Sequence, residues 1–428
     1  MTADPSSSVP FFRPTITNDE IEEVISVLRS GWLTTGPKTA QFEKDFSSLV
    51  GARYAVALNS CTAALHLAVE ALNLEQGEAV LVPTMTFAAT AEVVRYSGAL
   101  PILVDCDGTT LNIDLEDAGN KLNSMTERMR NGNGETRPVG IMPVHVGGFM
   151  ADIKALKAFA ARHSFWMVED AAHAFPAAWR TNKAEEWQRC GEHTAHVTCF
   201  SFYANKTITT GEGGMAVTDD EELAERIRFM SLHGLSKAAW SRYSAEGTWD
   251  YKIIAPGYKY NMSDIAAAIG IHQAARAEEM RKEREKIADR YRKAFESMPE
   301  IELPPVDANR IHSWHLFPVK LRLDRLNIDR NTFFQFLKLR GVGCSVHWRP
   351  LHLHPYYQKR FGWRPEDCPT ASEVWERLVS LPIFPDMREK ETKYVISVVK
   401  ELCCRHSKLQ MKATRARLHA TQPSLANR

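Results

Sequence analysis

The chain of 428 residues has little that would direct it to a membrane or to a disulfide-stabilised fold. It contains no apolar run of the length that spans a bilayer, and its first residues, MTADPSSS, have neither a basic region nor an apolar stretch. Its eight cysteines form no CxxC pair and no metal-ligand spacing. We therefore expect a cytoplasmic protein without membrane contact, whose thiols are reduced and mostly buried.

The chain also lacks a strong excess of either charge, because 53 Lys and Arg nearly balance 52 Asp and Glu. Its content of 44% apolar and 25% charged residues is that of an ordinary globular protein. One asymmetry lies at the end, where residues 405–428 contain six basic residues and no acidic one. We expect a basic, disordered tail there and assign it no function, so nucleic acid is not an expected partner.

A chain of this length exceeds what one hydrophobic core supports, so we expect two domains. Residues 1–259 alternate short apolar strands with helical stretches, which is typical of an α/β fold with a mixed, mostly parallel sheet. Residues 260–404 are predicted to form a smaller α+β domain that begins with one long amphipathic helix. The turn-rich residues 131–134 predict an exposed loop, and residues 234–257 lack clear periodicity. The expected strands are residues 54–58, 79–82, 100–104, 140–144, 165–169, 197–202 and 215–217, then 314–321 and 342–347, and the expected helices are 61–72, 87–97, 151–163, 220–233, 263–296 and 330–339.

Two polar residues at the ends of predicted strands carry the strongest chemical signal. The strand at 197–202 leads to Lys206 and then to a glycine turn, and the apolar strand before it delivers Asp170. A carboxylate that ends so apolar a run is costly unless it has a partner or a function. Pyridoxal phosphate (PLP) needs these two groups, because a lysine forms its Schiff base and a carboxylate pairs with its pyridine nitrogen.

Other residues near these strand ends admit two interpretations each. Ser60 follows a strand and opens a helix, where it can help to hold a phosphate or can simply cap the helix. Ser201 offers a second hydroxyl to the phosphate or is structural. Phe87 lies at a strand end, where ligands gather in open α/β sheets, and it can stack on a pyridine ring or belong to the core. The histidines at 347, 352 and 354 lack a fourth ligand and a helical pair, so we expect no metal site.

A series of short motifs runs through almost the whole chain. They are FRP at 12–14, SGWLTTGP at 30–37, NSCTAALHL at 59–67, VH at 144–145, EDAAH at 169–173, SF with Lys206 at 201–206 and EGG at 212–214. In this order and spacing they resemble the sugar-nucleotide aminotransferases of the DegT/DnrJ/EryC1/StrS family. The resemblance implies a type I PLP-dependent transferase, similar to aspartate aminotransferase, with a seven-stranded sheet. It also implies a homodimer whose active sites are shared between subunits.

The resemblance assigns roles to individual residues. Lys206 becomes the Schiff-base lysine and general base, and Asp170 the partner of the pyridine nitrogen. Asn261 would reach the cofactor phosphate of the neighbouring subunit, and Cys61 replaces the commoner glycine. The resemblance assigns no residue to the donor carboxylate, for which Arg228 and His233 are candidates only by their position near the glycine turn. The remaining expected cofactor contacts are Ser60, Cys61, Thr62 and Ser201 at the phosphate, Phe87 against the ring and His173 beside the phenolic oxygen, and the expected substrate contacts are Thr34, His347 and His352.

The implied reaction moves an amino group from L-glutamate to a keto group, C4 favoured over C3, of a nucleotide-linked sugar. The segment PGYKYNMSDI at 256–265 is similar to that of transferases that form 4-amino-4-deoxy-arabinose on a uridine nucleotide. Two alternatives stay open: a transaminase for a cyclic ketone such as a keto-inositol, and a non-catalytic PLP-binding regulator. Relatives with histidine at the lysine position are dehydratases, and Lys206 argues against that activity.

Overall fold

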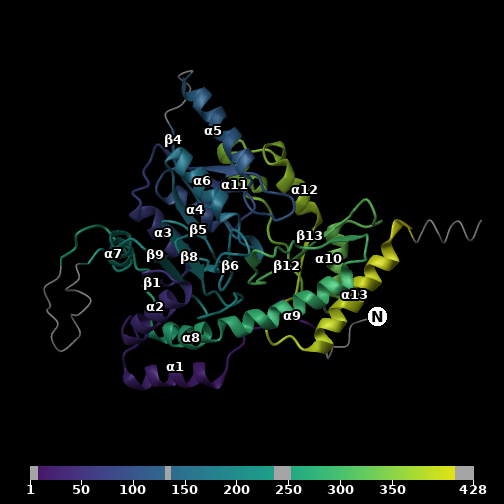
Figure 1. Cartoon of the computed structure of the whole chain (residues 1–428), viewed down its shortest axis with the longest axis horizontal. Helices are drawn as coiled ribbons and strands as arrows, with labels where there is room; N and C mark the ends of the chain where they lie inside the picture. Colours follow the sequence, from purple (N-terminus) through teal and green to yellow (C-terminus); the bar gives the residue numbers. More distant parts are fainter. Residues whose placement is uncertain (1–7, 131–135, 236–251, 410–428) are drawn as a thin grey trace, which may run out of the picture.

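A seven-stranded sheet forms the centre of the computed structural model, which describes residues 8–130, 136–235 and 252–409 (Figure 1). Its strand order is β1-β9-β8-β5-β4-β2-β3. β9 is antiparallel to both of its neighbours, and the other adjacent pairs are parallel. The prediction of a mixed, mostly parallel sheet is therefore confirmed. The strands are β1 (Tyr54–Leu58), β2 (Glu78–Pro83), β3 (Leu100–Val104), β4 (Arg137–Ile141), β5 (Trp166–Asp170), β8 (Val197–Ser201) and β9 (Gly214–Thr218).

Helices cover both faces of this sheet, which explains why its strands read as continuous apolar runs. Successive strand residues point to opposite faces, so Leu81 joins one core and Val80 the other. The first core includes α2, α6 and α8, and the second includes α3, α4 and α7. The helices before the second half of the chain are α1 (Asn18–Ser30), α2 (Pro37–Val50), α3 (Cys61–Ala71), α4 (Ala89–Tyr96), α5 (Leu115–Arg130), α6 (Ile153–His163) and α7 (Glu221–Met230), with the short 3₁₀ helix η2 (Val146–Gly148).

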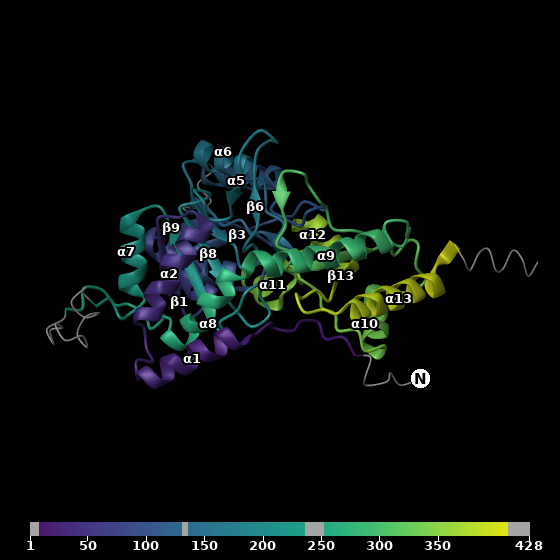
Figure 2. The same cartoon turned by 60° about the horizontal axis from the view of Figure 1, so that its bottom comes forward.

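A separate apolar core forms around a small antiparallel sheet of the order β10-β12-β13. Its largest buried side chains include Tyr291, Phe295 and Phe317. Figure 2 shows α9 running from the large sheet towards this separate core, where α10 and α13 lie. The elements are α8 (Asp264–Ala275), α9 (Ala277–Phe295), α10 (Arg330–Leu339), α11 (Pro355–Phe361), α12 (Pro369–Arg377), α13 (Glu389–His406), η4 (Leu351–Leu353), η5 (Pro365–Asp367), β10 (Ile301–Glu302), β12 (Phe317–Leu321) and β13 (Leu378–Leu381), and a third sheet joins β6 (Ala178–Trp179), β7 (Gln188–Arg189) and β11 (Arg310–Ile311).

Two predicted elements of the second half are corrected. The single helix expected at 263–296 is two helices, because Arg276 leaves the helical conformation between α8 and α9. The break lets α8 stay in the first core of the large sheet, while α9 leaves that core after Met280 and continues into the separate core around the small sheet. The strand expected at 342–347 is irregular instead, and Val342 and Ser345 form only isolated bridges, with Val9 and Ser380.

Residues 260–404 contribute to more than one core. α8 packs with the large sheet, and the N–H groups of Thr370 and Ala371, in α12, donate to the carboxylate of Asp105 after β3. α13 continues to His406, and residues 410–428 of the predicted tail lie outside the described residues. The predicted loop at 131–134 and most of the segment 234–257 lie outside them as well. None of the described helices is long and apolar enough to cross a membrane.

Asp264 ties the start of α8 to the start of α2. Its buried carboxylate accepts hydrogen bonds from the N–H groups of Gly36, Lys38 and Thr39 and from the Thr39 hydroxyl, at 2.7 to 3.1 Å. The N-cap of α2 is Gly36, which has no side-chain acceptor to cap the helix. Asp264 therefore satisfies N–H groups that otherwise have no partner in the helix. The carboxylate also suits the positive end of the helix dipole.

We predict that Asp264→Ala destabilises the protein by about 3 kcal/mol, because two buried donors of Thr39 and two part-buried N–H groups lose a charged acceptor at once. Asp264→Asn keeps one acceptor oxygen and is expected to cost less. Ser263→Ala is the matched control, since it removes only the cap of α8 and is expected to cost about 1 kcal/mol. Urea unfolding of the three variants measures the order, and equal losses for Asp264→Ala and Ser263→Ala would contradict it.

Candidate active site

The candidate site is a cavity of about 480 Å³ at the carboxyl ends of β5 and β8. These strands are parallel neighbours, with Asp170 paired to Cys199, so their ends lie at the same edge of the sheet. A tight turn after β8, in which the Lys206 N–H donates to the Tyr203 carbonyl, brings Lys206 back to this edge. The predicted residues that line the cavity are Ser60, Cys61, Thr62, Phe87, Asp170, His173, Ser201, Lys206 and His347.

Asp170 is a buried carboxylate that takes its hydrogen bonds from neutral groups. The Thr90 hydroxyl donates to Oδ2 at 2.7 Å, and the Ala172 N–H donates to Oδ1 at 3.1 Å. Burial raises the pKa of Asp170, although these hydrogen bonds and the charge of Lys206 act in the opposite direction. A buried carboxylate held in this way gains from a cationic partner, and a protonated pyridine nitrogen is such a partner.

Lys206 carries the amine of the site. Burial lowers the pKa of Lys206 to about 8, while the negative charge of Asp170 works against this shift. A lysine with this pKa has a substantial fraction of free amine near neutral pH, and the free amine is the form that attacks a carbonyl. The residue therefore fits a Schiff-base lysine.

The N-terminus of α3 forms the other end of the cavity. Ser60 caps the helix by accepting the Ala63 N–H at 3.1 Å, and the residues of the first turn, Cys61 and Thr62, line the cavity. Gly214 in β9 allows this arrangement, because a Cβ there would lie 2.4 Å from the Cys61 nitrogen. Burial raises the pKa of the Cys61 thiol well above its usual value, so the thiol stays neutral and does not repel an anion. A helix N-terminus with neighbouring hydroxyls fits a phosphate group.

Two rings complete the fit to PLP. Phe87 is 63% exposed although it lines the cavity, so its ring offers a face to a planar ligand. The Gly147 N–H donates to Nδ1 of His173 at 3.3 Å, and burial lowers the pKa of His173 well below its usual value. The imidazole is therefore neutral with its proton on Nε2, which leaves Nε2 as a donor for a phenolic oxygen.

Several predicted contacts lie away from the cavity of their own chain. The Asn261 amide donates to the Thr35 hydroxyl at 2.7 Å, and the carbonyl of the exposed Thr34 accepts the Asp264 N–H. Arg228 forms a paired contact with Glu43 at 2.8 and 3.0 Å, so it is engaged elsewhere in the fold. His233, the other candidate for the donor carboxylate, lies next to Tyr258, whose carbonyl accepts the His233 N–H.

His352 has a structural position. Its side chain is fully buried, Nδ1 bonds to the Thr84 hydroxyl at 2.7 Å and Nε2 to the Ser372 hydroxyl at 2.8 Å. The expectation that it contacts substrate is therefore corrected, because both ring nitrogens already have partners within the fold. His347 does line the cavity, where burial lowers its pKa to about 4 and Ser380 bonds its Nδ1 at 2.9 Å.

Three contributors were missed by the sequence interpretation. His315 and Trp348 flank His173, with ring centroids 4.2 and 5.0 Å from it, and both line the cavity. Thr90 lies on α4 and holds Asp170. His315 and Trp348 come from the second half of the chain, where no local pattern distinguishes a cavity residue from a core residue.

Comparisons with known proteins agree with this geometry. The model of the DegT/DnrJ/EryC1/StrS aminotransferase family matches residues 14–400. The chain is 43% identical over 398 residues to the spore coat polysaccharide biosynthesis protein SpsC of Bacillus subtilis, covering 92% of this chain and 97% of that protein. It is 44% identical over 396 residues to the uncharacterized protein MJ1066 of Methanocaldococcus jannaschii, covering 92% and 98%. The PLP form of the putative sugar aminotransferase Spr1654 from Streptococcus pneumoniae superposes with a TM-score of 0.82 at 31% identity, covering 93% of this chain and 99% of that one.

We predict that the rate at which apo-protein takes up PLP depends on pH through Lys206. Below pH 8 the rate is expected to rise about tenfold per pH unit, because only the unprotonated amine reacts, and to level off above about 8. Stopped-flow absorption of the visible band measures this rate.

Lys206→Arg is the matched control, since it keeps a positive charge but has no reactive amine. It is expected to develop no visible band at any pH after free PLP is removed. A band in this variant, or a rate that is independent of pH in the wild type, would count against the assignment of Lys206.

Proposed function

The chain belongs to the DegT/DnrJ/EryC1/StrS aminotransferase family and is a PLP-dependent aminotransferase; we propose that it moves an amino group from L-glutamate to a keto group of a nucleotide-linked sugar, with C4 favoured over C3. The observation that carries the proposal is the meeting of the Lys206 amine and the buried Asp170 carboxylate in one cavity.

The chain supplies a base and a charge to this reaction. PLP, when bound, supplies an electron sink for the electrons that are left when the donor α-carbon loses its proton. Nζ of Lys206 takes that proton and returns one in the second half of the reaction, for which a pKa of about 8 is suitable near neutral pH. Asp170 holds a proton on the pyridine nitrogen, which its buried carboxylate favours strongly.

Other residues hold and orient the cofactor. The N-terminus of α3, with Ser60, Cys61 and Thr62, and the hydroxyl of Ser201 would hold the phosphate. Phe87 would pack against the ring. Nε2 of His173 would donate to the phenolic oxygen, a role that the Gly147 N–H supports by fixing the imidazole tautomer.

A sugar acceptor is supported by the relatives. SpsC is named for the biosynthesis of spore coat polysaccharide, and Spr1654 is described as a putative sugar aminotransferase. The nucleotide and the C4 position rest on the motif at residues 256–265. The substrate enters beside His347, which lines the same cavity as Lys206.

We also propose a homodimer in which each site takes residues from both subunits. Asn261 and Thr34 lie together, since Asn261 bonds Thr35 and the Thr34 carbonyl accepts the N–H of Asp264. Thr34 is exposed and Asn261 partly buried, and neither lines the cavity of its own chain. The exposed Thr34 can meet the substrate of a neighbouring subunit, and Asn261 would exchange its hydrogen bond to Thr35 for one to that subunit's cofactor phosphate.

The proposed reaction is tested in two halves. L-glutamate is expected to bleach the visible band of the PLP-loaded protein, and a keto-sugar nucleotide is expected to restore it. Restoration by 4-keto but not by 3-keto sugar nucleotides supports C4. Restoration by a keto-inositol alone would replace the sugar nucleotide by a cyclic ketone, and a band that glutamate never bleaches would favour a non-catalytic role.

The shared site is tested by mixing two inactive variants, Lys206→Ala and Asn261→Ala. After refolding together, half of the dimers contain one subunit of each kind, and such a dimer has one intact site. About a quarter of the wild-type activity is therefore expected to return. Each variant refolded alone is the control, and no recovery in dimers of confirmed mixed composition would contradict a shared site.

A further inference from the structure

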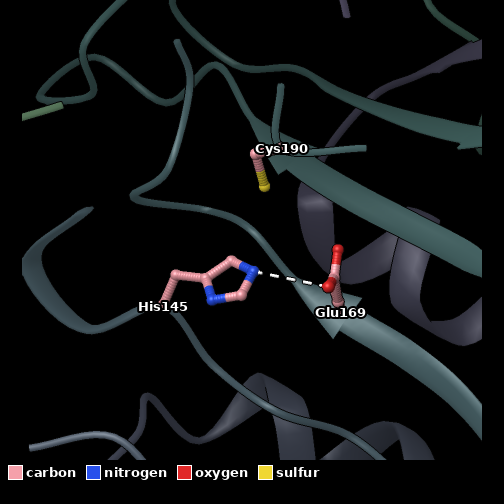
Figure 3. Close-up of side chains that lie close together, drawn as sticks. All are labelled: His145, Glu169 and Cys190. Atoms are coloured by element: carbon pink, nitrogen blue, oxygen red, sulfur yellow. Dashed lines mark ion pairs between the residues drawn. The ribbon is translucent and has the colours of Figure 1, made fainter. Parts of the chain in front are cut away.

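Three buried side chains come together on the far side of β5 from the cavity. His145, Glu169 and Cys190 place their polar atoms within 4.8 Å of one another, and their side chains point towards a common centre (Figure 3). His145 and Glu169 are fully buried, and Cys190 is 1% exposed. The facing atoms, Nε2 of His145 and Oε1 of Glu169, lie 3.7 Å apart, and neither has a hydrogen-bond partner among the residues that the structure describes. Buried polar atoms in this state call for an explanation.

The hydrogen bonds around this cluster fix its protons. The Ala151 N–H donates to Nδ1 of His145 at 3.2 Å, so the proton of a neutral ring is on Nε2 and faces Glu169. The hydroxyls of Thr194 and Thr198 donate to Oε2 of Glu169 at 2.6 and 2.8 Å. Burial alone would raise the pKa of Glu169, but His145 and these hydroxyls outweigh it and lower the pKa. The cluster therefore holds one carboxylate surrounded by donors.

The same hydrogen bonds argue against a metal ion. His, Glu and Cys are all metal ligands, but a metal on Nε2 requires the ring proton to be on Nδ1. The Ala151 N–H already points at Nδ1, so two donors would then face each other. Burial also raises the pKa of the Cys190 thiol well above its usual value, which disfavours the thiolate that a metal needs.

The cluster is joined through the backbone to two groups of the site. Glu169 precedes Asp170 in β5, so the two carboxylates point to opposite faces, and the His145 N–H donates to the Asp170 carbonyl at 3.3 Å. On the other side, the His145 ring closes the loop 145–151 by accepting the Ala151 N–H. Within that loop lies the Gly147 N–H, which donates to Nδ1 of His173.

We propose that His145 and Glu169 are a pair of positioning residues that hold Asp170 and His173 in place for the cofactor. Glu169 fixes the end of β5 from behind through Thr194 and Thr198. His145 fixes the loop whose Gly147 N–H sets the tautomer of His173. The inference rests on the PLP chemistry of the proposed function and not on the identity of the amino acceptor.

The two nitrogens of His145 are separated by two substitutions. Asn places its oxygen near the position of Nδ1 and keeps an acceptor for Ala151, whereas Gln places its amide near Nε2 and loses that acceptor. Glu169→Gln has one oxygen where the carboxylate has two, so its amide nitrogen faces either the Nε2 proton of His145 or the Thr194 and Thr198 hydroxyls, and one of these sets of donors loses its acceptor. Cys190→Ala is the matched control, because it removes a thiol from the same cluster and none of these hydrogen bonds.

Titration of apo-protein with PLP and the pH dependence of the visible band are the readouts. His145→Gln and Glu169→Gln are expected to weaken PLP binding about tenfold, the loss of one well-placed hydrogen bond, while His145→Asn and Cys190→Ala stay within about threefold of wild type. In His145→Gln the pH midpoint of the visible band is also expected to rise. In the high-pH form the negative charge of the phenolic oxygen is not balanced by a positive charge, and a weaker hydrogen bond from His173 stabilises this form less.

Thermal unfolding of each apo-variant separates positioning from loss of fold, and if His145→Gln does not fold, Glu169→Gln against Cys190→Ala decides. The proposal is overturned if all folded variants bind PLP alike, or if elemental analysis finds stoichiometric zinc that Cys190→Ala loses. Neither readout needs an amino acceptor, so failure of the sugar assignment would leave this result unaffected.

Discussion

The parallel pairing of β5 with β8 is the constraint on which the proposed site depends. It sets Asp170 opposite Cys199, so that β8 continues past the end of β5 to the turn that carries Lys206. Side chains alternate along a strand, and a register shift of one residue would exchange the faces of Glu169 and Asp170. Asp170 would then face the buried cluster that contains His145, and Glu169 would face the cavity. The apolar cores on both faces of the sheet hold this register in place.

Burial gives the proposed catalytic groups their character. It lowers the pKa of Lys206 to about 8 and raises the pKa of Asp170, so the charged form of each group is less favoured than it would be in water. The histidines that line the cavity are affected in the same way. Burial lowers the pKa of His173, His315 and His347, so these rings are neutral and do not compete with Lys206 as cations. They remain available as hydrogen-bond donors and acceptors.

Much of the large sheet follows from local sequence. Each of its strands is a short apolar run, and Asp170 and Lys206 stand out because a charged residue interrupts or ends such a run. Ser60, Phe87 and Ser201 were candidates because they follow or end predicted strands, the family resemblance chose between the two interpretations of each, and the structure gathers all three at the same cavity. These positions are close in sequence to a strand end, so parallel topology alone brings them together.

The second half of the chain was harder to predict, because its contacts are long-range. Arg276 gives no sequence signal that a helix ends there, and the break depends on α8 and α9 entering different cores. His347 comes shortly before the short helix η4 and His352 lies in it, yet His347 lines the cavity and His352 is buried against Thr84. The sequence could not distinguish the two positions, because the contacts that fix each histidine come from residues far away in the chain.

The central claim is that Lys206 holds the cofactor opposite Asp170, and one measurement tests it directly. Borohydride reduction of the PLP-loaded protein fixes the cofactor to its lysine, and peptide mass spectrometry then locates the label. The account predicts a single labelled site, at Lys206. A label on another lysine, or no label on a folded protein that binds PLP, would contradict it.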